Sequence, residues 1–252
     1  MFKEIKNKKV LITGANGGIG VATAELFAKH GALVGIHYYQ SQKRALELRR
    51  KITSFGGRAE ILKEADLTKS ASRHNLIREF IQKFGRIDVL VNNAGGVYGV
   101  KDFLSLDERS WEKTFALNAA APFFLAQEAF RCMEKQRGGR IINISSVAAK
   151  YGGSATTLHY GAAKAALEAI TKGLARAGAP YNVLVNTVRG GIIDTLFHQK
   201  IHRTKADLQK RVKLTPLGRM GRPSDIAQMV LFLASRGGDY ITGETFTVAG
   251  GD

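Results

Sequence analysis

The chain has 252 residues, of which 44% are hydrophobic, and a formal net charge of +17. This length and composition fit one α/β domain with a sizeable core, and the single cysteine, Cys132, excludes an internal disulfide and a cysteine-based zinc cluster. No long apolar run indicates a membrane span, and residues 1–8 lack the apolar segment of an export signal, so a cytoplasmic protein is expected.

The first predicted unit is a short buried strand at residues 9–13, followed by a glycine-rich turn and a helix. The turn reads Thr13-Gly14-Ala15-Asn16-Gly17-Gly18-Ile19-Gly20. Glycine lets the backbone approach a pyrophosphate closely, and free N–H groups at a helix N-terminus attract its charge. An ordinary turn is the alternative, but the position directly after a strand favours a dinucleotide site. Its predicted contacts are Gly14, Asn16, Gly17, Gly18, Ile19 and Gly20.

Apolar strands then alternate with helical patterns along the rest of the chain. The further strands are predicted at residues 32–38, 58–63, 87–91, 140–145, 182–188 and 245–248. This alternation is typical of a parallel, doubly wound sheet. We therefore expect a single-domain, Rossmann-type α/β fold of about seven strands flanked by helices over residues 1–252.

The end of the second strand bears on the choice of nicotinamide cofactor. In NAD-binding folds an acidic residue about twenty positions after the glycine turn binds the ribose 2′-hydroxyl. No carboxylate lies between Glu25 and Glu47 in this chain, so a 2′-phosphate would meet no repulsion. NADP(H) is therefore favoured, with NAD(H) as the alternative. The candidate phosphate contacts are His37, Ser41, Lys43 and Arg44.

Polar residues follow two of the later strands, where ligands bind in open α/β sheets. Asn92-Asn93-Ala94-Gly95 comes after the strand at 87–91, and Ser145-Ser146 comes at the end of the strand at 140–145. Asn118 lies four residues before Pro122, which has no N–H to bond the Asn118 carbonyl and leaves that carbonyl for water. The alternatives are a strand-end cap for Ser146 and a polar residue at a proline kink for Asn118.

Tyr160 and Lys164 lie four residues apart in an alanine-rich stretch. In a helix this spacing places the phenol and the ammonium on one face, about one turn apart. A nearby cation favours phenolate and would bring the phenol pKa from roughly 10 toward neutrality, where an acid or base is most useful. The pair indicates proton transfer, with an exposed Tyr and Lys on an ordinary helix as the alternative.

Taken in order, the glycine turn, the Asn-Asn-Ala-Gly segment, Ser146 and the Tyr160/Lys164 pair resemble the short-chain dehydrogenase/reductase family. The resemblance covers about Lys9 to Gly251 and is closest to the 3-oxoacyl-[acyl-carrier-protein] reductase branch. It implies hydride transfer between NAD(P)(H) and a carbonyl or alcohol. It also implies that Tyr160 is the acid/base, that Lys164 lowers its pKa and holds the nicotinamide ribose, and that Ser146 steadies the substrate oxygen. Asn118 would anchor a proton-relay water.

The same resemblance extends the cofactor site. Asp66 would meet the adenine amino group, with a helix cap before Lys69 as the alternative, and Thr195 would contact the nicotinamide carboxamide. Gly17 stands where NADP-preferring relatives often have a basic residue, which counts against NADP(H). The further implied contacts are Leu67, Asn92, Ala94, Gly95, Tyr160, Lys164, Gly191 and Ile193.

A mobile lid is expected over about residues 190–215, and it departs from the family pattern at its start. Gly190 replaces the customary proline, which predicts a looser loop. His198 and His202 lack a neighbouring carboxylate, so a basic lid is favoured over a metal site and no metal is predicted. His159 is expected at the pocket wall or in packing, and is a candidate substrate contact beside Ser146 and Tyr160. The lid carries more cations than acids, which favours an anionic substrate. Its acids are Asp194 and Asp207, and its cations are Lys200, Arg203, Lys205, Lys210, Arg211 and Lys213.

The net positive charge predicts attraction to polyanions. An acidic acyl carrier protein is the expected partner, since Arg137 matches a carrier-gripping position, although Tyr181 occupies its partner position. A sugar or polyol dehydrogenase and a non-catalytic nucleotide-sensing or nucleic-acid-binding protein are the alternatives. The resemblance also implies a dimer or tetramer, with the helices from Trp111 to Met133 and from Gly161 to Ala175 as candidate interfaces. No membrane contact is expected.

Overall fold

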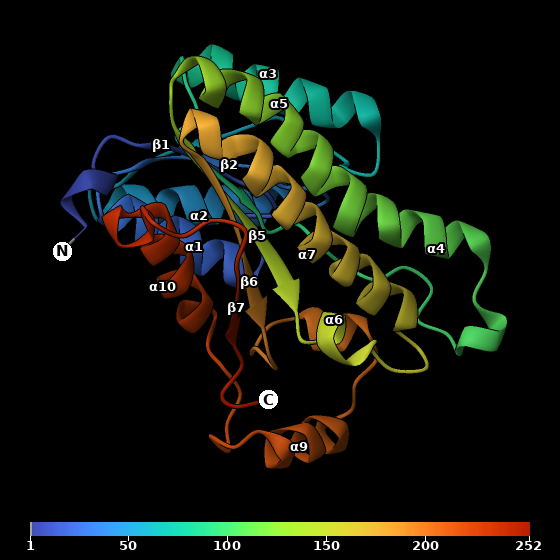
Figure 1. Cartoon of the computed structure of the whole chain (residues 1–252). Coiled ribbons are helices and arrows are strands. Elements are labelled where there is room, and N and C mark those ends of the chain that lie inside the picture. Colours follow the sequence, from blue (N-terminus) through green and yellow to red (C-terminus); the bar gives the residue numbers. More distant parts are fainter. Residues whose placement is uncertain (1) are drawn as a thin grey trace.

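The computed structural model describes residues 2–252 and is built around one parallel seven-stranded sheet (Figure 1). The strand order is β3-β2-β1-β4-β5-β6-β7. The strands are β1 (Lys9–Ile12), β2 (Leu33–Ile36), β3 (Arg58–Ile61), β4 (Val89–Asn92), β5 (Gly139–Ser146), β6 (Val183–Gly190) and β7 (Thr245–Val248). All seven predicted strands and the Rossmann-type fold class are confirmed.

Helices cover both faces of the sheet (Figure 1). The α-helices are α1 (Gly18–Lys29), α2 (Gln42–Ser54), α3 (Ser70–Phe84), α4 (Glu108–Phe115), α5 (Ala121–Lys135), α6 (Ala148–Tyr151), α7 (Leu158–Gly178), α8 (Phe197–Lys200), α9 (Lys205–Leu214) and α10 (Pro223–Ala234). Single turns of 3-10 helix are η1 (Lys3–Ile5), η2 (Phe103–Ser105), η4 (Ala179–Tyr181) and η5 (Arg236–Gly238), and η3 (Ala116–Ala120) is a π-helix. Over residues 2–252, no helix combines the length and the apolar character that crossing a bilayer requires.

Strand β1 shows how the sheet is buried on both sides. Val10 and Ile12 belong to the core cluster shared with α1, α2 and α10, whereas Leu11 belongs to the cluster shared with α3, α5 and α7. Successive side chains of a strand point to opposite faces, so an unbroken apolar run is what a strand with helices on both faces needs. All three side chains are fully buried.

The chain reverses its direction of winding at β1, which pairs with β2 on one side and β4 on the other. The loops after these strands therefore diverge and leave a crevice at the carboxyl edge of the sheet, which is where open α/β folds bind ligands. Helices α6 and α9 lie at this edge in Figure 1.

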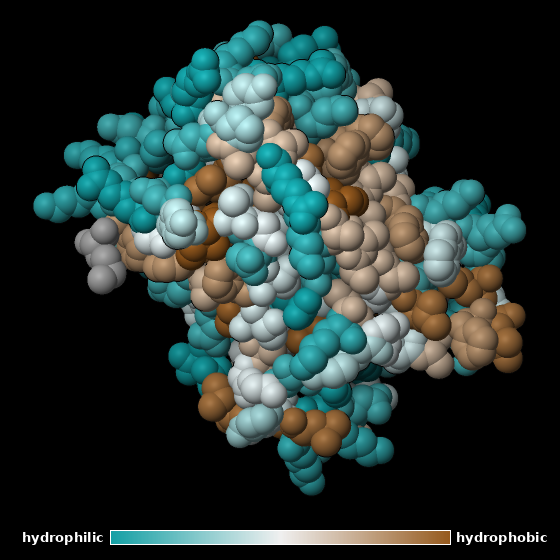
Figure 2. Space-filling model, in the orientation of Figure 1, coloured by the Kyte–Doolittle hydropathy of each residue, from teal (hydrophilic) through white to brown (hydrophobic). Residues whose placement is uncertain are grey.

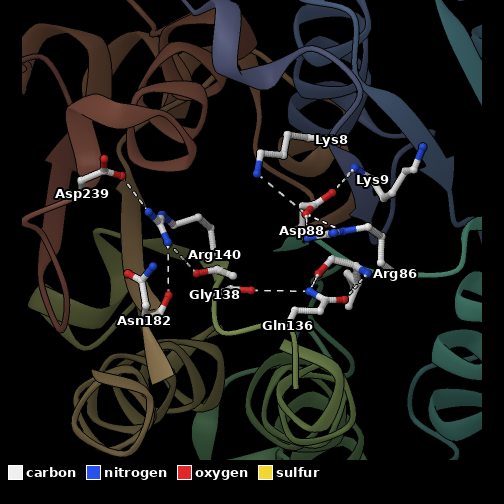
Figure 3. A network of polar contacts seen from close by, with 11 residues as sticks. Lys8, Lys9, Arg86, Asp88, Gln136, Gly138, Arg140, Asn182 and Asp239 are labelled. Carbon is white, nitrogen blue, oxygen red and sulfur yellow. Dashed lines mark hydrogen bonds and ion pairs between the residues drawn. The ribbon is translucent and has the colours of Figure 1, made fainter. Parts of the chain in front are cut away.

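The opposite, amino edge is closed by a polar network (Figure 3). The Asp88 carboxylate accepts hydrogen bonds from the Lys9 backbone N–H at 2.8 Å and from Arg86 Nε at 3.0 Å. Arg140 at the start of β5 pairs with Asp239 at 2.7 Å. These contacts link the first residues of several strands, and their distance from the carboxyl edge gives them a structural role.

Candidate active site

A cavity of about 1190 Å³ opens at the carboxyl edge of the sheet. Its wall includes the glycine turn, Ser146 at the end of β5, and both Tyr160 and Lys164 on α7. These segments are far apart in the sequence, and the parallel sheet brings them together because all its strands end at the same edge.

Three glycines of the turn occupy positions where a side chain would strain the backbone or collide with a neighbour. Gly14 has φ of +60°, and a Cβ atom on Gly18 would lie 2.6 Å from Thr195 Cγ2. A Cβ on Gly20 would lie 2.3 Å from the Gly14 carbonyl oxygen, so Gly20 serves close packing and does not itself line the cavity. Helix α1 begins at Gly18 and turns its free N–H groups to this turn, an arrangement that fits a dinucleotide pyrophosphate.

Asn93, which was not among the predicted contacts, ties the end of β4 to the glycine turn. Its Nδ2 donates to the Thr13 carbonyl at 2.8 Å and to the Gly14 carbonyl at 3.0 Å. Asn92 was predicted to contact the cofactor, but it does not line the cavity. Its side chain is buried and donates to Asn143 Oδ1 at 2.9 Å. The alternation of side chains along the strand end turns Asn92 inward, and Asn93, Ala94 and Gly95 form the wall.

His37 lies beneath the glycine turn with both ring nitrogens occupied. The Gly14 N–H donates to Nδ1 at 2.9 Å, and Nε2 lies 2.9 Å from the Ala65 carbonyl, to which it must donate. Burial lowers the pKa of His37 to about 4. His37 lines the cavity as expected of a cofactor contact, but its ring is neutral and both nitrogens already bind the backbone, so it offers a 2′-phosphate no free donor.

Acidification is expected to destabilise the fold through His37. Because the pKa falls from 6.5 to about 4 on folding, the unfolded chain takes up a proton below pH 6.5 that the folded chain resists. The stability from neutral His37 is complete above pH 6.5 and declines toward pH 4, by about 3 kcal/mol at most. Urea unfolding between about pH 7 and 5 should show a shallower decline for His37→Gln than for the wild type. His202→Gln, at an exposed position, is the control, and equal slopes in all three would contradict this role.

Of the residues expected near the adenosine, Arg44, Asp66 and Leu67 line the cavity, whereas Lys43 does not. Helix α2 begins at Gln42, and its first turn directs Arg44 and not Lys43 to the cavity. Asp66 Oδ1 accepts hydrogen bonds from the N–H and hydroxyl of Thr68 at 3.0 and 2.7 Å. The carboxylate thus both shapes this loop and faces the cavity.

Tyr160 and Lys164 lie one above the other on α7, as their spacing predicts. Lys164 Nζ lies 5.7 Å from the centre of the Tyr160 ring and donates to the Ile144 carbonyl at 2.7 Å. Both side chains are almost fully buried. The backbone of β5 thus fixes the ammonium beside the phenol.

The expected lowering of the Tyr160 pKa by Lys164 is not found. Burial raises the pKa of Tyr160 to about 12, and the groups that oppose this rise are the Ser146 hydroxyl, through a hydrogen bond, and the charge of Arg203. Lys164 is itself buried, which lowers its pKa to about 8, and its ammonium is directed at a backbone carbonyl. The phenol therefore holds its proton, which suits an acid better than a base.

Ser146 ends β5 next to Gly190 of β6, with which it is in register. Its hydroxyl accepts a hydrogen bond from the Ala148 N–H at 3.1 Å, so Ser146 caps the strand end and also faces the phenol. The loose loop expected at Gly190 is absent: the Val147 N–H donates to the Gly190 carbonyl at 2.9 Å, and Gly190 also pairs with Val248. Strands on both sides fix this residue without a proline.

Asn118 lies in the π-helix η3, four residues before Pro122, which is the second residue of α5. The missing proline N–H and the widened turn agree with the expected distortion, and π-turns are frequent at functional sites. The Asn118 side chain is fully buried and does not line the cavity. Its Nδ2 donates to the carbonyls of Thr114 and Gly96, both at 2.7 Å, which holds it behind Gly95.

His159 does not reach the cavity, so its prediction as a substrate contact is wrong. The ring is buried, and Nε2 lies 2.7 Å from the Tyr98 carbonyl, to which it donates. Its neighbour Tyr160 points into the cavity because consecutive helix residues face different directions. Tyr98 lines the wall and was missed, since no motif marks it.

The lid over the cavity is formed by α8, α9 and their flanks. The Phe197 ring lies 5.4 Å from the Tyr160 ring, and the His198 ring donates from Nε2 to the Ile193 carbonyl at 2.9 Å. Gly191, Ile193 and Thr195 line the cavity as predicted. Of the six lid cations, three line it, namely Lys200, Arg203 and Arg211.

The two positions considered for binding an acyl carrier protein, Arg137 and Tyr181, lie away from the cavity. Arg137 follows α5 and precedes β5, and Tyr181 precedes β6, so both lie at the amino edge of the sheet. Strand β5 runs its full length between Arg137 and Ser146. The two positions therefore do not border this chain's own cavity.

Comparison with known proteins gives matches over almost the whole chain. The model of the family described as enoyl-(acyl carrier protein) reductase matches residues 14–252. An L-rhamnose 1-dehydrogenase (NAD(P)(+)) from Azotobacter vinelandii is 39% identical over 252 residues, covering 97% of this chain and 96% of the relative. A 3-oxoacyl-[acyl-carrier-protein] reductase from Aquifex aeolicus is 37% identical over 248 residues, covering 98% of each chain.

Solved structures give the same result. A short-chain dehydrogenase/reductase from Serratia marcescens is similar with a TM-score of 0.90 and 32% identity, covering 98% of each chain. A putative NAD(P)-dependent gluconate 5-dehydrogenase from Beutenbergia cavernae, solved with bound NADP, has a TM-score of 0.91 and 29% identity, covering 98% of this chain and 96% of that one.

Proposed function

Because the chain belongs to the short-chain dehydrogenase/reductase family and is thus an NAD(P)-dependent oxidoreductase acting on CH–OH or C=O groups, we propose that it reduces a carbonyl with NADPH, a 3-oxoacyl thioester being the first candidate substrate. The observation that carries the proposal is the meeting of Ser146, Tyr160 and Lys164 with the glycine turn in one dinucleotide-sized cavity, and the raised pKa of the buried phenol favours reduction. A group whose pKa is about 12 gives a proton to a developing alkoxide more readily than it takes one from an alcohol.

In this mechanism each side chain has one task. The nicotinamide, when bound, supplies the hydride. The Ser146 hydroxyl orients the carbonyl oxygen by a hydrogen bond, and Tyr160 donates its proton to that oxygen, so hydride and proton together convert C=O to CH–OH. The Ser146 hydroxyl and the charge of Arg203 favour the phenolate as it forms, and Lys164, whose Nζ lies 5.7 Å from the centre of the Tyr160 ring, would hold the nicotinamide ribose. Water held at Asn118 returns the proton.

The substrate class rests on the relatives and on the lid. Similarity to a 3-oxoacyl-[acyl-carrier-protein] reductase and the cationic cavity wall support an acyl thioester. The second candidate is a sugar, supported by 39% identity to an L-rhamnose 1-dehydrogenase. A protein carrier is supported less, since Arg137 lies at the far edge of the sheet. Family membership speaks against the non-catalytic alternative.

The test is the initial rate of NADPH consumption with an acetoacetyl thioester, set against NADP⁺ reduction with L-rhamnose. A rate with the thioester that disappears in Tyr160→Phe supports the proposal. A rate with the sugar alone would move the assignment to the second candidate. Absence of both, with NADPH binding verified, would refute the two substrate classes.

A preference for NADPH over NADH is expected to depend on Arg44. Of the nearby carboxylates within residues 2–252, Asp66 is engaged with Thr68 through Oδ1, and Glu64 accepts a hydrogen bond from the Gln40 N–H at 2.7 Å. Removing a charge-assisted contact in Arg44→Ala should raise the KM for NADPH about 10-fold and change that for NADH little. Lys43→Ala, at the adjacent position outside the cavity, is the matched control. Equal effects of Arg44→Ala on both cofactors would contradict the assignment.

We also propose that the chain forms a dimer or tetramer through the α4–α5 and α7 faces. Trp111 stacks on Phe115 and is 40% exposed, and Phe124 is 42% exposed. Figure 2 shows a pale to brown surface over α5 and α7 where the rim is teal. Light scattering measures the mass, and a monomer at micromolar concentration would contradict the proposal.

A further inference from the structure

Arg203 is a half-buried cation in the cavity wall that lacks a protein partner. It lies between α8 and α9, close enough to Tyr160 for its charge to act on the phenol. Within residues 2–252 its guanidinium forms no ion pair and no hydrogen bond. Arg211, on the same wall, is instead paired with Asp252, and Arg189 is paired with Glu168.

The backbone on both sides of Arg203 is fixed. The Arg203 N–H donates to the His198 carbonyl at 3.0 Å. Thr204 begins α9 with a capping box, in which the Asp207 carboxylate accepts from Thr204 Oγ1 at 2.7 Å. The charge of Asp207 raises the pKa of Arg203 through space, but the Asp207 carboxylate is exposed and its hydrogen bonds go to this cap. The guanidinium is therefore held at the cavity by the lid fold and not by a neighbouring acid.

The cavity wall around Arg203 is strongly cationic. Lys113, Lys200 and Arg211 also line the cavity, whereas Asp66 is the only lining carboxylate within residues 2–252. Burial lowers the pKa of Arg203, although a guanidinium stays charged at any ordinary pH. A partly desolvated cation without a counter-ion is costly, and an anionic ligand would offset that cost with charge-assisted, bidentate hydrogen bonds.

We propose that Arg203 is a substrate-binding residue that holds an oxyanion of the substrate while the carbonyl lies at Tyr160 and Ser146. This inference rests on the proposed carbonyl reduction and names the substrate feature that the lid selects. The oxyanion is either the carboxylate of an oxo acid or a phosphate of a coenzyme A thioester, since a guanidinium binds both. Neutral carbonyl compounds are poorer substrates.

Two matched pairs of 3-oxobutanoyl substrates separate the sources. Acetoacetate is compared with ethyl acetoacetate, and acetoacetyl-coenzyme A with the neutral acetoacetyl-N-acetylcysteamine. The wild type should prefer the anionic member of one pair, and Arg203→Gln should reduce that preference about 10- to 100-fold. The ratio within a pair is the readout, because losing Arg203 also alters the charge felt by Tyr160 and lowers all rates. The pair whose preference falls in Arg203→Gln shows whether the bound oxyanion is the carboxylate or a phosphate.

Arg203→Lys should keep part of the preference, since ammonium is a point charge without the guanidinium fork. Lys210→Gln, an exposed cation on α9 outside the cavity, is the matched control and should leave both ratios unchanged. Ratios that stay within about twofold of the wild type in Arg203→Gln, for both pairs, would overturn the proposal.

If the wild type reduces none of the four compounds, the proposed function fails, and binding then tests Arg203 by itself. Calorimetric titration of acetoacetate and of coenzyme A into the complex with NADP⁺, which cannot react with them, is compared for wild type and Arg203→Gln. Weaker binding of either anion by about 10-fold or more in the variant supports the anion site. Equal binding, or none to the wild type, refutes it.

Discussion

Replacing Tyr160 with Phe is expected to lower kcat about 100- to 10,000-fold, because the variant keeps the ring and loses the hydroxyl that gives its proton to the substrate oxygen. The ring packs against Phe197 at 5.4 Å, and that contact survives the change. The fold should therefore be retained, and the loss should appear in kcat and not in the binding of NADPH. Stopped-flow or steady-state absorbance of the nicotinamide measures the rate.

Tyr151→Phe is the matched control for this experiment. Tyr151 also lines the cavity, but it is 51% exposed at the mouth and its hydroxyl accepts a hydrogen bond from Lys150 Nζ at 3.0 Å. It should lose no more than a few-fold in kcat, since its hydroxyl does not face Ser146. A Tyr160→Phe variant with most of its activity would remove Tyr160 from the chemistry.

The strands and the proton-transfer pair could be predicted because their signals are local. Apolar runs such as Val10-Leu11-Ile12 and the four-residue spacing of Tyr160 and Lys164 depend only on strand and helix geometry. Both agree with the structure. The motif segments meet at one edge for the same reason, because a parallel sheet aligns the carboxyl ends of its strands.

The errors fall where a side chain's direction depends on partners distant in the sequence. His37 and His159 each donate to a backbone carbonyl, of Ala65 and of Tyr98, and no local pattern shows this. The pKa of Tyr160 is raised, where the sequence pattern predicts a lowered value, for a similar reason. Spacing shows that Lys164 is near, but the cost of burying the phenol is set by the lid and by α7 packing, which only the assembled fold shows.

Gly95→Ala is expected to lower kcat about 10- to 100-fold and to lower the free energy of unfolding by only about 1 kcal/mol. A Cβ atom at this position would lie 2.9 Å from Asn118 Oδ1 and 3.2 Å from Lys164 Nζ. Both atoms are ends of side chains and can yield, but the Gly96 N–H donates to Asn118 Oδ1 at 3.2 Å and Lys164 Nζ donates to the Ile144 carbonyl at 2.7 Å, so moving them weakens these hydrogen bonds. Their displacement, however, separates Lys164 from Tyr160 and disturbs the proposed water site, and an error of about 1 Å in such groups can cost 100-fold in rate.

Gly96→Ala is the matched control, because a Cβ there would meet only Leu117 Cδ2 at the ordinary distance of 3.6 Å. Neither glycine has a positive φ, so neither substitution strains the backbone. The two variants should therefore melt at similar temperatures and differ in kcat, a comparison that calorimetry and the NADPH assay can make on the same samples. Equal kcat values would mean that Asn118 and Lys164 tolerate displacement and that their fixed positions do not determine the rate. A melting temperature of Gly95→Ala low enough to explain the loss of kcat by unfolding would instead show that the glycine serves the fold, because Asn118 and Lys164 would then resist the added methyl group and not yield to it.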